Sequence, residues 1–143
     1  MAPISGGSLL VPGSVVAEVI DFANPKPYRD APDWLMGELE WNGWHIPIVN
    51  FARLAGTSAD NRVPHRSRVL VVRTLSEDSS VLYIGLVIGG LPRFRIVTTG
   101  NLEETDTATA EGVFSHVSVE KQAAAIPDLD ALARGIEAAT KRA

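Results

Sequence analysis

The sequence predicts a mainly β fold in which helix is the minority element. The chain has 12 glycines and 9 prolines spread along its length, and the apolar segments between them are short. Several of these segments are rich in valine and isoleucine, which favour strands. With 143 residues, of which 45% are hydrophobic, there is enough apolar material for one compact domain or two very small ones.

Composition excludes several classes of protein. The chain has no cysteine, which excludes a disulfide framework, a zinc ribbon and a thiol nucleophile. The net charge of -4 argues against a basic surface that would bind nucleic acid or an anionic membrane. The longest apolar run, Val81 to Leu91, is about half of the roughly 20 residues that a membrane-spanning helix needs. Because the first residues do not form an export signal, we expect a cytoplasmic protein without membrane insertion.

The first third of the chain predicts two strands and an extended connector. Leu9–Val11 and Val15–Ile20 are rich in branched residues and are separated by Pro12-Gly13-Ser14, which predicts a corner. Asn24-Pro25-Lys26-Pro27 is expected to be extended, because a residue before a proline is kept out of the α region. A short turn is predicted over residues 31–34.

A β-hairpin is predicted over residues 35–49. Asn42-Gly43 separates two alternating runs, and these two residue types tolerate both positive φ angles of a type I′ turn. If they form the loop, the register follows. On an apolar side Trp41 lies opposite Trp44, Leu39 opposite Ile46 and Gly37 opposite Ile48, and on a polar side Glu40 lies opposite His45 and Glu38 opposite Pro47.

Three further strands are expected beyond the hairpin. Residues 50–56 begin with a capping residue and end with glycine, which predicts one short helical turn. Residues 57–65 are polar and predict a loop. The three apolar segments that follow are expected to form a meander, and they span residues 68–75, 81–88 and 93–98.

The last third predicts an acidic loop, a strand and a helix. Residues 99–111 hold acidic side chains and no lysine or arginine, which indicates an exposed, mobile loop, and residues 113–119 resume a strand. Residues 128–141 place apolar side chains at i, i+3, i+4 and i+7 with acidic residues first and basic residues last, which predicts an amphipathic helix. The residues predicted to face the core are Leu129, Leu132, Ala133 and Ile136.

No local motif indicates catalysis or a metal site. The three histidines are far apart in the sequence, and there is no Gly-x-Ser-x-Gly elbow. Glu38 and Glu40 share one face of a strand, which can raise the pKa of one carboxylate for general acid work, although a solvated strand face is the more ordinary interpretation. His45 is expected to pair with Glu40 across the hairpin. We therefore expect no catalytic residue, no metal and no cofactor.

The tryptophan pair at the hairpin turn has two interpretations. Two indoles beside a turn either fill the adjacent core or present an aromatic anchor to a partner, because tryptophan is enriched among interface residues that dominate affinity. The core role is favoured for Trp41. For Trp44 both roles stay open, because Ile46 and Ile48 can supply the core contacts of that strand without it.

The order of these segments resembles the CheW-like family of adaptors in bacterial chemosensory arrays. The resemblance rests on segments in a fixed order: Leu10-Val11-Pro12 with Val16–Ile20, Pro32–Gly37, Gly43–Phe51 with Leu54-Ala55-Gly56, Val69–Val72 and Ile84–Ile88. It implies a single domain over residues 1–143 with two intertwined, five-stranded, SH3-like β-barrels and a short C-terminal helix. It also implies no catalytic activity, because family members bridge receptors to the histidine kinase CheA.

Two departures from the family pattern bear on function. Where the family usually has Asn-Leu-Arg-Gly, this chain has Glu40-Trp41-Asn42-Gly43, so Asn42 replaces an arginine associated with partner contact. The first strand, before Leu9, is expected to be short or missing. This divergence is more similar to auxiliary adaptors such as ChpC of type IV pilus chemosensory systems, which implies a role in twitching motility.

Three hypotheses of function follow from the sequence. The leading one is a non-enzymatic adaptor that binds a CheA-like histidine kinase, a chemoreceptor or another CheW-like domain. Its candidate contact residues are Glu40, Trp41, Asn42, Trp44 and His45. One alternative is a small β-barrel enzyme or ligand-binding protein that uses Glu38, Glu40 and His45. The other is a self-associating module, a weak homo-oligomer in which exposed strand edges pair two copies.

Overall fold

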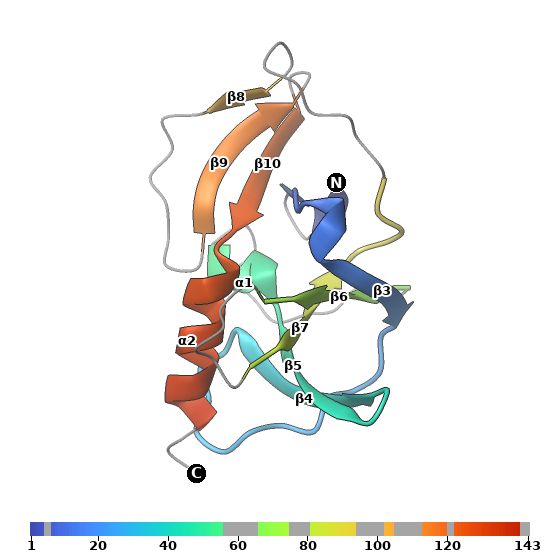
Figure 1. The fold of residues 1–143 in the computed structure, drawn as a ribbon, viewed down its shortest axis with the longest axis vertical. Helices are drawn as coiled ribbons and strands as arrows, with labels where there is room; N and C mark the ends of the chain where they lie inside the picture. The colour runs from blue at the N-terminus through green and yellow to red at the C-terminus, as the bar shows by residue number, and fades with distance from the viewer. Residues whose placement is uncertain are drawn as a thin grey trace.

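The protein is built from two five-stranded sheets that share a core, as the computed structural model shows (Figure 1). The structure describes residues 1–4, 7–55, 66–74, 81–93, 102–104, 113–119 and 122–140. Strands dominate these residues and the longer of two α-helices lies near the C-terminus, so the mainly β prediction is confirmed. Among the described helices, none is long and apolar enough to cross a membrane.

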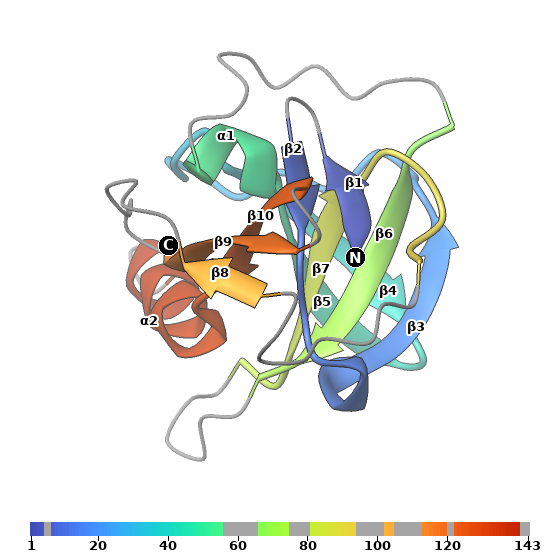
Figure 2. The same cartoon turned by 90° about the horizontal axis from the view of Figure 1, so that it is seen from above.

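The first sheet, here called the central sheet, is formed by the middle of the chain in the order β3-β6-β7-β5-β4. Neighbouring strands are antiparallel except β5 and β7, which are parallel. In Figure 2 β6, β7 and β5 run side by side. The strands are β3 (Val16–Asp21), β4 (Leu35–Trp41), β5 (Trp44–Val49), β6 (Arg68–Arg73) and β7 (Tyr83–Ile88).

The second sheet, here called the terminal sheet, joins the two ends of the chain in the order β1-β2-β10-β9-β8. β2 and β10 are parallel, with Leu9 opposite Ala125, and the other neighbours are antiparallel. The strands are β1 (Ala2–Ile4), β2 (Gly7–Leu9), β8 (Leu102–Glu104), β9 (Val113–Val119) and β10 (Gln122–Pro127).

Both α-helices begin after a capping side chain, of which Asn50 was predicted from the sequence. In α1 (Phe51–Ala55) the backbone N–H of Arg53 donates to Asn50 Oδ1 at 3.3 Å. In α2 (Leu129–Thr140) the N–H of Ala131 donates to Asp128 Oδ1 at 3.0 Å. A short 3₁₀ turn, η1 (Gly13–Val15), forms the predicted corner before β3. The four α2 residues predicted to face the core are all buried.

A single large cluster of buried side chains joins the two sheets and α2. It takes Leu9 and Ala125 from the terminal sheet, Leu70 and Leu86 from the central sheet, and Leu132 from α2. Because side chains alternate along a strand, the other face of the central sheet carries a second cluster. That cluster consists of Ile46, Ile48, Val69, Val71 and Val87, and a third, smaller one in the terminal sheet consists of Val117 and Ala124.

Several sequence predictions need correction. β10 was not predicted, because alanine has low β propensity and residues 123–125 are all alanine. β8 lies inside the segment expected to be a loop, and it is a strand because it pairs with β9. The strand expected over residues 9–11 is β2, which ends at Leu9. The predicted loop over residues 57–65 and all but the first residue of the predicted strand over residues 93–98 lie outside the described residues.

Candidate partner-binding site

The β4–β5 hairpin has the turn and register that the sequence predicts. Asn42 and Gly43 have φ angles of 48° and 80°, as a type I′ turn requires. All five predicted cross-strand pairs occur, from Trp41 opposite Trp44 to Gly37 opposite Ile48. The predicted polar side is polar only near the turn, because Pro47 is buried. In Figure 1 this hairpin lies at the end of the molecule opposite the terminal sheet.

A glycine in β4 allows the proline-containing connector to lie against the hairpin. Gly37 has a φ of 142°, and a Cβ at this position would overlap the carbonyl oxygen of Lys26. The close approach permits a β-bridge in which the backbones of Lys26 and Glu38 exchange two hydrogen bonds of 2.9 Å each. As a result Tyr28, two residues after the bridge, comes within hydrogen-bonding reach of Glu38.

Three aromatic rings form a cluster beside the turn. The ring of Tyr83, the first residue of β7, makes edge contacts with Trp41 and Trp44, with centroid separations of 5.1 and 5.4 Å. Trp41 is partly buried against the Ile46–Val87 side of the central sheet, and its Nε1 donates to Glu18 Oε2 at 2.5 Å. Trp44 remains 45% exposed. Trp41 therefore packs with the core, whereas Trp44 lies at the surface.

His45 contacts a different carboxylate from the one expected. The expected partner was Glu40, which is directly opposite in the register, but His45 Nδ1 lies 3.8 Å from Glu38 Oε1. Diagonal neighbours on a strand pair are within reach of long side chains, and Glu38 is the less exposed of the two carboxylates. The predicted His45–Glu40 contact is therefore replaced by a His45–Glu38 contact.

Glu38 also accepts a hydrogen bond from Tyr28. Burial of the phenol, the negative charge of Glu38 and this hydrogen bond all raise the pKa of Tyr28 well above its ordinary value. The phenol consequently keeps its proton and acts as a fixed donor. Tyr28, Glu38 and His45 thus form a connected polar row at the side of the hairpin.

This polar row and two residues of the aromatic cluster, Trp44 and Tyr83, are among the residues that line a small hollow of about 220 Å³. Residues from the connector and hairpin, the start of β7 and the second half of α2 surround it, so three regions distant in sequence meet there. The lining residues are Tyr28, Glu38, Trp44, His45, Ile46, Pro47, Val81, Leu82, Tyr83, Ile136 and Thr140.

The structure brings together only part of the predicted site. Trp44 and His45 line the hollow and Trp41 supports it through Tyr83, whereas Glu40 and Asn42 are exposed and do not line it. Sequence reasoning missed Tyr28, Tyr83 and Leu82. An aromatic residue at the start of an apolar run is a weak signal for Tyr83, but only the parallel pairing of β7 with β5 places it beside the hairpin.

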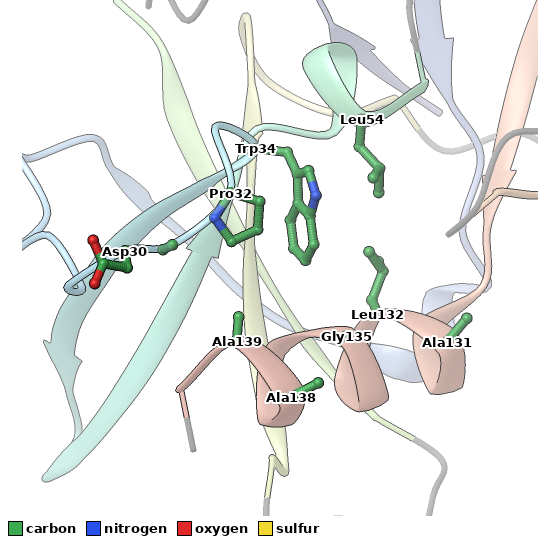
Figure 3. A pocket seen from close by; sticks show the side chains of 10 residues that line it. Asp30, Pro32, Trp34, Leu54, Ala131, Leu132, Gly135, Ala138 and Ala139 are labelled. Carbon is green, nitrogen blue, oxygen red and sulfur yellow. The ribbon is translucent and has the colours of Figure 1, made fainter. Parts of the chain in front are cut away.

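A larger cavity than this hollow lies elsewhere, between α2, α1 and the turn over residues 30–34 (Figure 3). It measures about 470 Å³ and is lined mainly by apolar residues, with the indole of Trp34 near the side chains of Leu54 and Leu132. Asp30 is the one ionisable residue among those described around it. No cluster of three or more potential metal ligands occurs among the described residues. The cavity therefore offers no convergent catalytic groups.

The family model of the CheW-like domain matches residues 1–137. The chain belongs to this family. A solved structure of similar fold is that of the scaffolding protein TtCheW from Thermoanaerobacter tengcongensis. The TM-score is 0.64 at 18% sequence identity, over 81% of this chain and 73% of that one. No curated protein matches the chain in sequence. The CheW-like fold expected from the ordered segments is therefore confirmed.

Proposed function

We propose that this CheW-like chain is a non-enzymatic adaptor that binds a CheA-like histidine kinase, a chemoreceptor or another CheW-like domain through the hairpin. The observation that carries the proposal is the exposed indole of Trp44 on a rigid support. A type I′ turn fixes the backbone beside Trp44, and the ring of Tyr83 makes an edge contact with its indole. A large aromatic side chain that is already ordered loses little conformational entropy on binding, which is why such residues dominate interface affinity.

The surroundings of Trp44 favour an interface over an enzyme site. Leu82, which is 37% exposed, lies on the same hollow and extends the apolar area. The hollow is smaller than the roughly 300 Å³ at which small-molecule pockets begin. Of the three residues assigned to an enzyme alternative, Glu40 does not line the hollow with Glu38 and His45. We therefore propose protein contact as the role of this surface.

The experiment is a binding measurement with the regulatory domain of a CheA-like kinase from the same genome. We expect a complex in the micromolar range, and Trp44→Ala should weaken it about thirtyfold, as for a residue that dominates an interface. Leu91→Ala is the matched control, because Leu91 is 65% exposed but does not line the hollow. It should leave the affinity within about twofold of the original value.

Absence of a complex with the kinase domain, a receptor tip or a second CheW-like domain at high micromolar concentration contradicts the adaptor proposal. Sedimentation of the chain alone over a range of concentrations tests the third hypothesis, self-association through strand edges. A monomer at all concentrations leaves the hetero-complex as the function, whereas a dimer that Trp44→Ala disrupts makes a second copy the partner.

We further propose that the chain is an auxiliary adaptor of the ChpC type, acting in the cytoplasm on a type IV pilus system. The support is the residue at the hairpin turn, where Asn42 replaces the family's arginine and its side chain is exposed. Deletion of the gene should reduce twitching motility and leave flagellar swimming unchanged. Loss of swimming chemotaxis with normal twitching would contradict this assignment.

A further inference from the structure

We propose that Glu18, on β3, is a positioning residue that holds the exposed indole of Trp44 in the orientation in which it meets a partner. It acts through two intermediate rings, those of Trp41 and Tyr83. This inference deepens the proposed function, on which it rests, by naming a residue that prepares Trp44 for binding. The observation that carries it is a hydrogen bond between side chains of β3 and β4, the two edge strands of the central sheet.

The strand register places the three aromatic side chains on one face of the central sheet. Trp41 is directly opposite Trp44 in the hairpin, and opposite residues of a strand pair share a face. In β7, Gly85 is opposite Ile48 of β5. Tyr83 and Trp44 lie two and four residues before this pair, so their side chains are on its face. The ring contacts of Tyr83 with both indoles agree with the register.

Glu18 reaches the same face from the other edge of the sheet. It is opposite Val71 of β6, and Val71 is opposite Gly85, so its side chain is on the face of the rings. As edge strands, β3 and β4 do not pair with each other through their backbones among the described residues. Trp41 Nε1–H donates to Glu18 Oε2 at 2.5 Å, and this side-chain contact therefore joins the two edges.

The hydrogen bond restricts the indole of Trp41. An indole has one N–H donor, so a bond to that donor selects one of the two broad orientations that the ring can take about its χ2 torsion. The acceptor is a carboxylate, and hydrogen bonds to charged acceptors are about twice as strong as neutral ones. Because Trp41 is only partly buried, packing alone leaves its ring more freedom than a core residue has.

Tyr83 passes this restriction to Trp44. Its ring makes edge contacts with both indoles, at interplanar angles of 60° for Trp41 and 63° for Trp44. Trp44 is 45% exposed, so much of its surface has no protein contact to restrict it. A side chain that is ordered before binding loses less conformational entropy in the complex. Glu18 thus raises the affinity by ordering Trp44.

The first test follows the motion of the indoles in the free protein. ¹⁵N relaxation of the three indole N–H groups reports the fast motion of each ring. Glu18→Ala should lower the order parameter of the Trp44 indole from about 0.8 to about 0.6. The Trp34 indole, which lines the larger cavity, should be unchanged. Glu18→Gln keeps an acceptor oxygen and should restore most of the order.

Asp21→Ala is the matched control. Asp21 is also an exposed carboxylate on β3, but it lies three residues from Glu18, on the opposite face, and pairs with Arg68 at 3.1 Å. This variant should leave the Trp44 indole unchanged. The melting temperatures of both alanine variants should stay within about 3 °C of the original, because exposed polar contacts contribute little to stability.

The second test measures binding to the kinase regulatory domain. Glu18→Ala should weaken the complex about fivefold, which corresponds to the cost of ordering one side chain. In a Trp44→Ala background the same change should alter the affinity by less than about 1.5-fold, because a residue that acts through Trp44 then has nothing to position. A residue that contacts the partner directly would give equal factors in both backgrounds.

Three results overturn the inference: an unchanged Trp44 indole in Glu18→Ala, an equal change of the Trp34 and Trp44 indoles, or equal binding factors for Glu18→Ala with and without Trp44. They leave the adaptor proposal standing if the complex still depends on Trp44. Conversely, an ordered Trp44 that depends on Glu18, without any protein complex, supports the contact between the strands as the source of order and contradicts the adaptor proposal.

Discussion

The two sheets reach their stability by different means. Each central strand has six or seven residues, and β6 is buried on both faces, with Val69 and Val71 on one side and Leu70 and Val72 on the other. In the terminal sheet β1, β2 and β8 have three residues each, and β10 contributes alanines. The central sheet thus has apolar clusters on both faces, whereas the separate cluster of the terminal sheet contains only two buried side chains among the described residues.

The difference teaches that the terminal sheet depends on contacts between distant parts of the chain. β2 and β10 join the first and last parts of the chain, and Leu10 N–H donates to the Ala125 carbonyl at 2.9 Å. The start of the chain is also tied to the segment after β7, where Gly89 N–H donates to the Pro3 carbonyl at 2.7 Å. Short strands with small side chains need such long-range pairing and the shared cluster, because they bury little surface themselves.

The largest effect is expected from a deletion in the shared cluster. Leu132 is fully buried on α2, so Leu132→Ala should lower the free energy of unfolding by about 3–4 kcal/mol. Since the cluster joins both sheets, denaturation followed by tryptophan fluorescence and by NMR signals of β9 and β10 should shift together. Arg134→Ala, at an exposed position of the same helix, should cost about 0.5 kcal/mol or less. Separate transitions would show that the two sheets unfold independently.

A smaller effect is expected where the connector meets the central sheet. Gly37→Ala introduces both a strained φ and an overlap with Lys26, and should cost about 2–3 kcal/mol in chemical denaturation. Gly43→Ala is the control, because Gly43 also has a positive φ but has no atoms within 4 Å of the added Cβ. It should cost about 1 kcal/mol. Equal losses of unfolding free energy for the two variants would mean that the contact with Lys26 does not restrict the residue at position 37.

The smallest effect tests the comparison between the sheets directly. Val71 and Val117 are both buried, one in each sheet, and Val→Ala removes the same atoms from each. We expect a loss of about 2 kcal/mol for Val71→Ala and about 1 kcal/mol for Val117→Ala, because the smaller cluster has fewer partners to lose. A larger loss at Val117 would reverse the proposed order of packing.

Local chemistry explains which elements could be predicted. The hairpin register follows from Asn42-Gly43, because a two-residue loop fixes every opposite pair. The α2 face follows from its helical period, and the start of α1 follows from the capping side chain of Asn50. β8 and β10 lack such signals, since their strand conformation is imposed by β9, which lies between them.

Part of the candidate site was predictable because it depends on the same local signal, the hairpin turn and its register. Trp44 and His45 are next to the turn, so their place on the surface follows from the register. Tyr28 and Tyr83 come from segments 16 residues before and 39 residues after Trp44, as the numbering shows. Only the Lys26–Glu38 bridge and the parallel pairing of β5 with β7 bring them to the hollow. The contact of His45 with Glu38 also depends on this packing.

The amino-acid sequence by itself determined the mainly β class, the hairpin with its turn, the amphipathic terminal helix and the likeness to CheW-like domains. These features depend on interactions between residues close in sequence or on the order of short segments. Tertiary structure decided the pairing of the chain ends, the contact of Tyr83 with Trp41 and Trp44, and the hollow beside Trp44. Such features depend on contacts across long loops, whose free energy is set by the packing of the whole molecule and has no local signature.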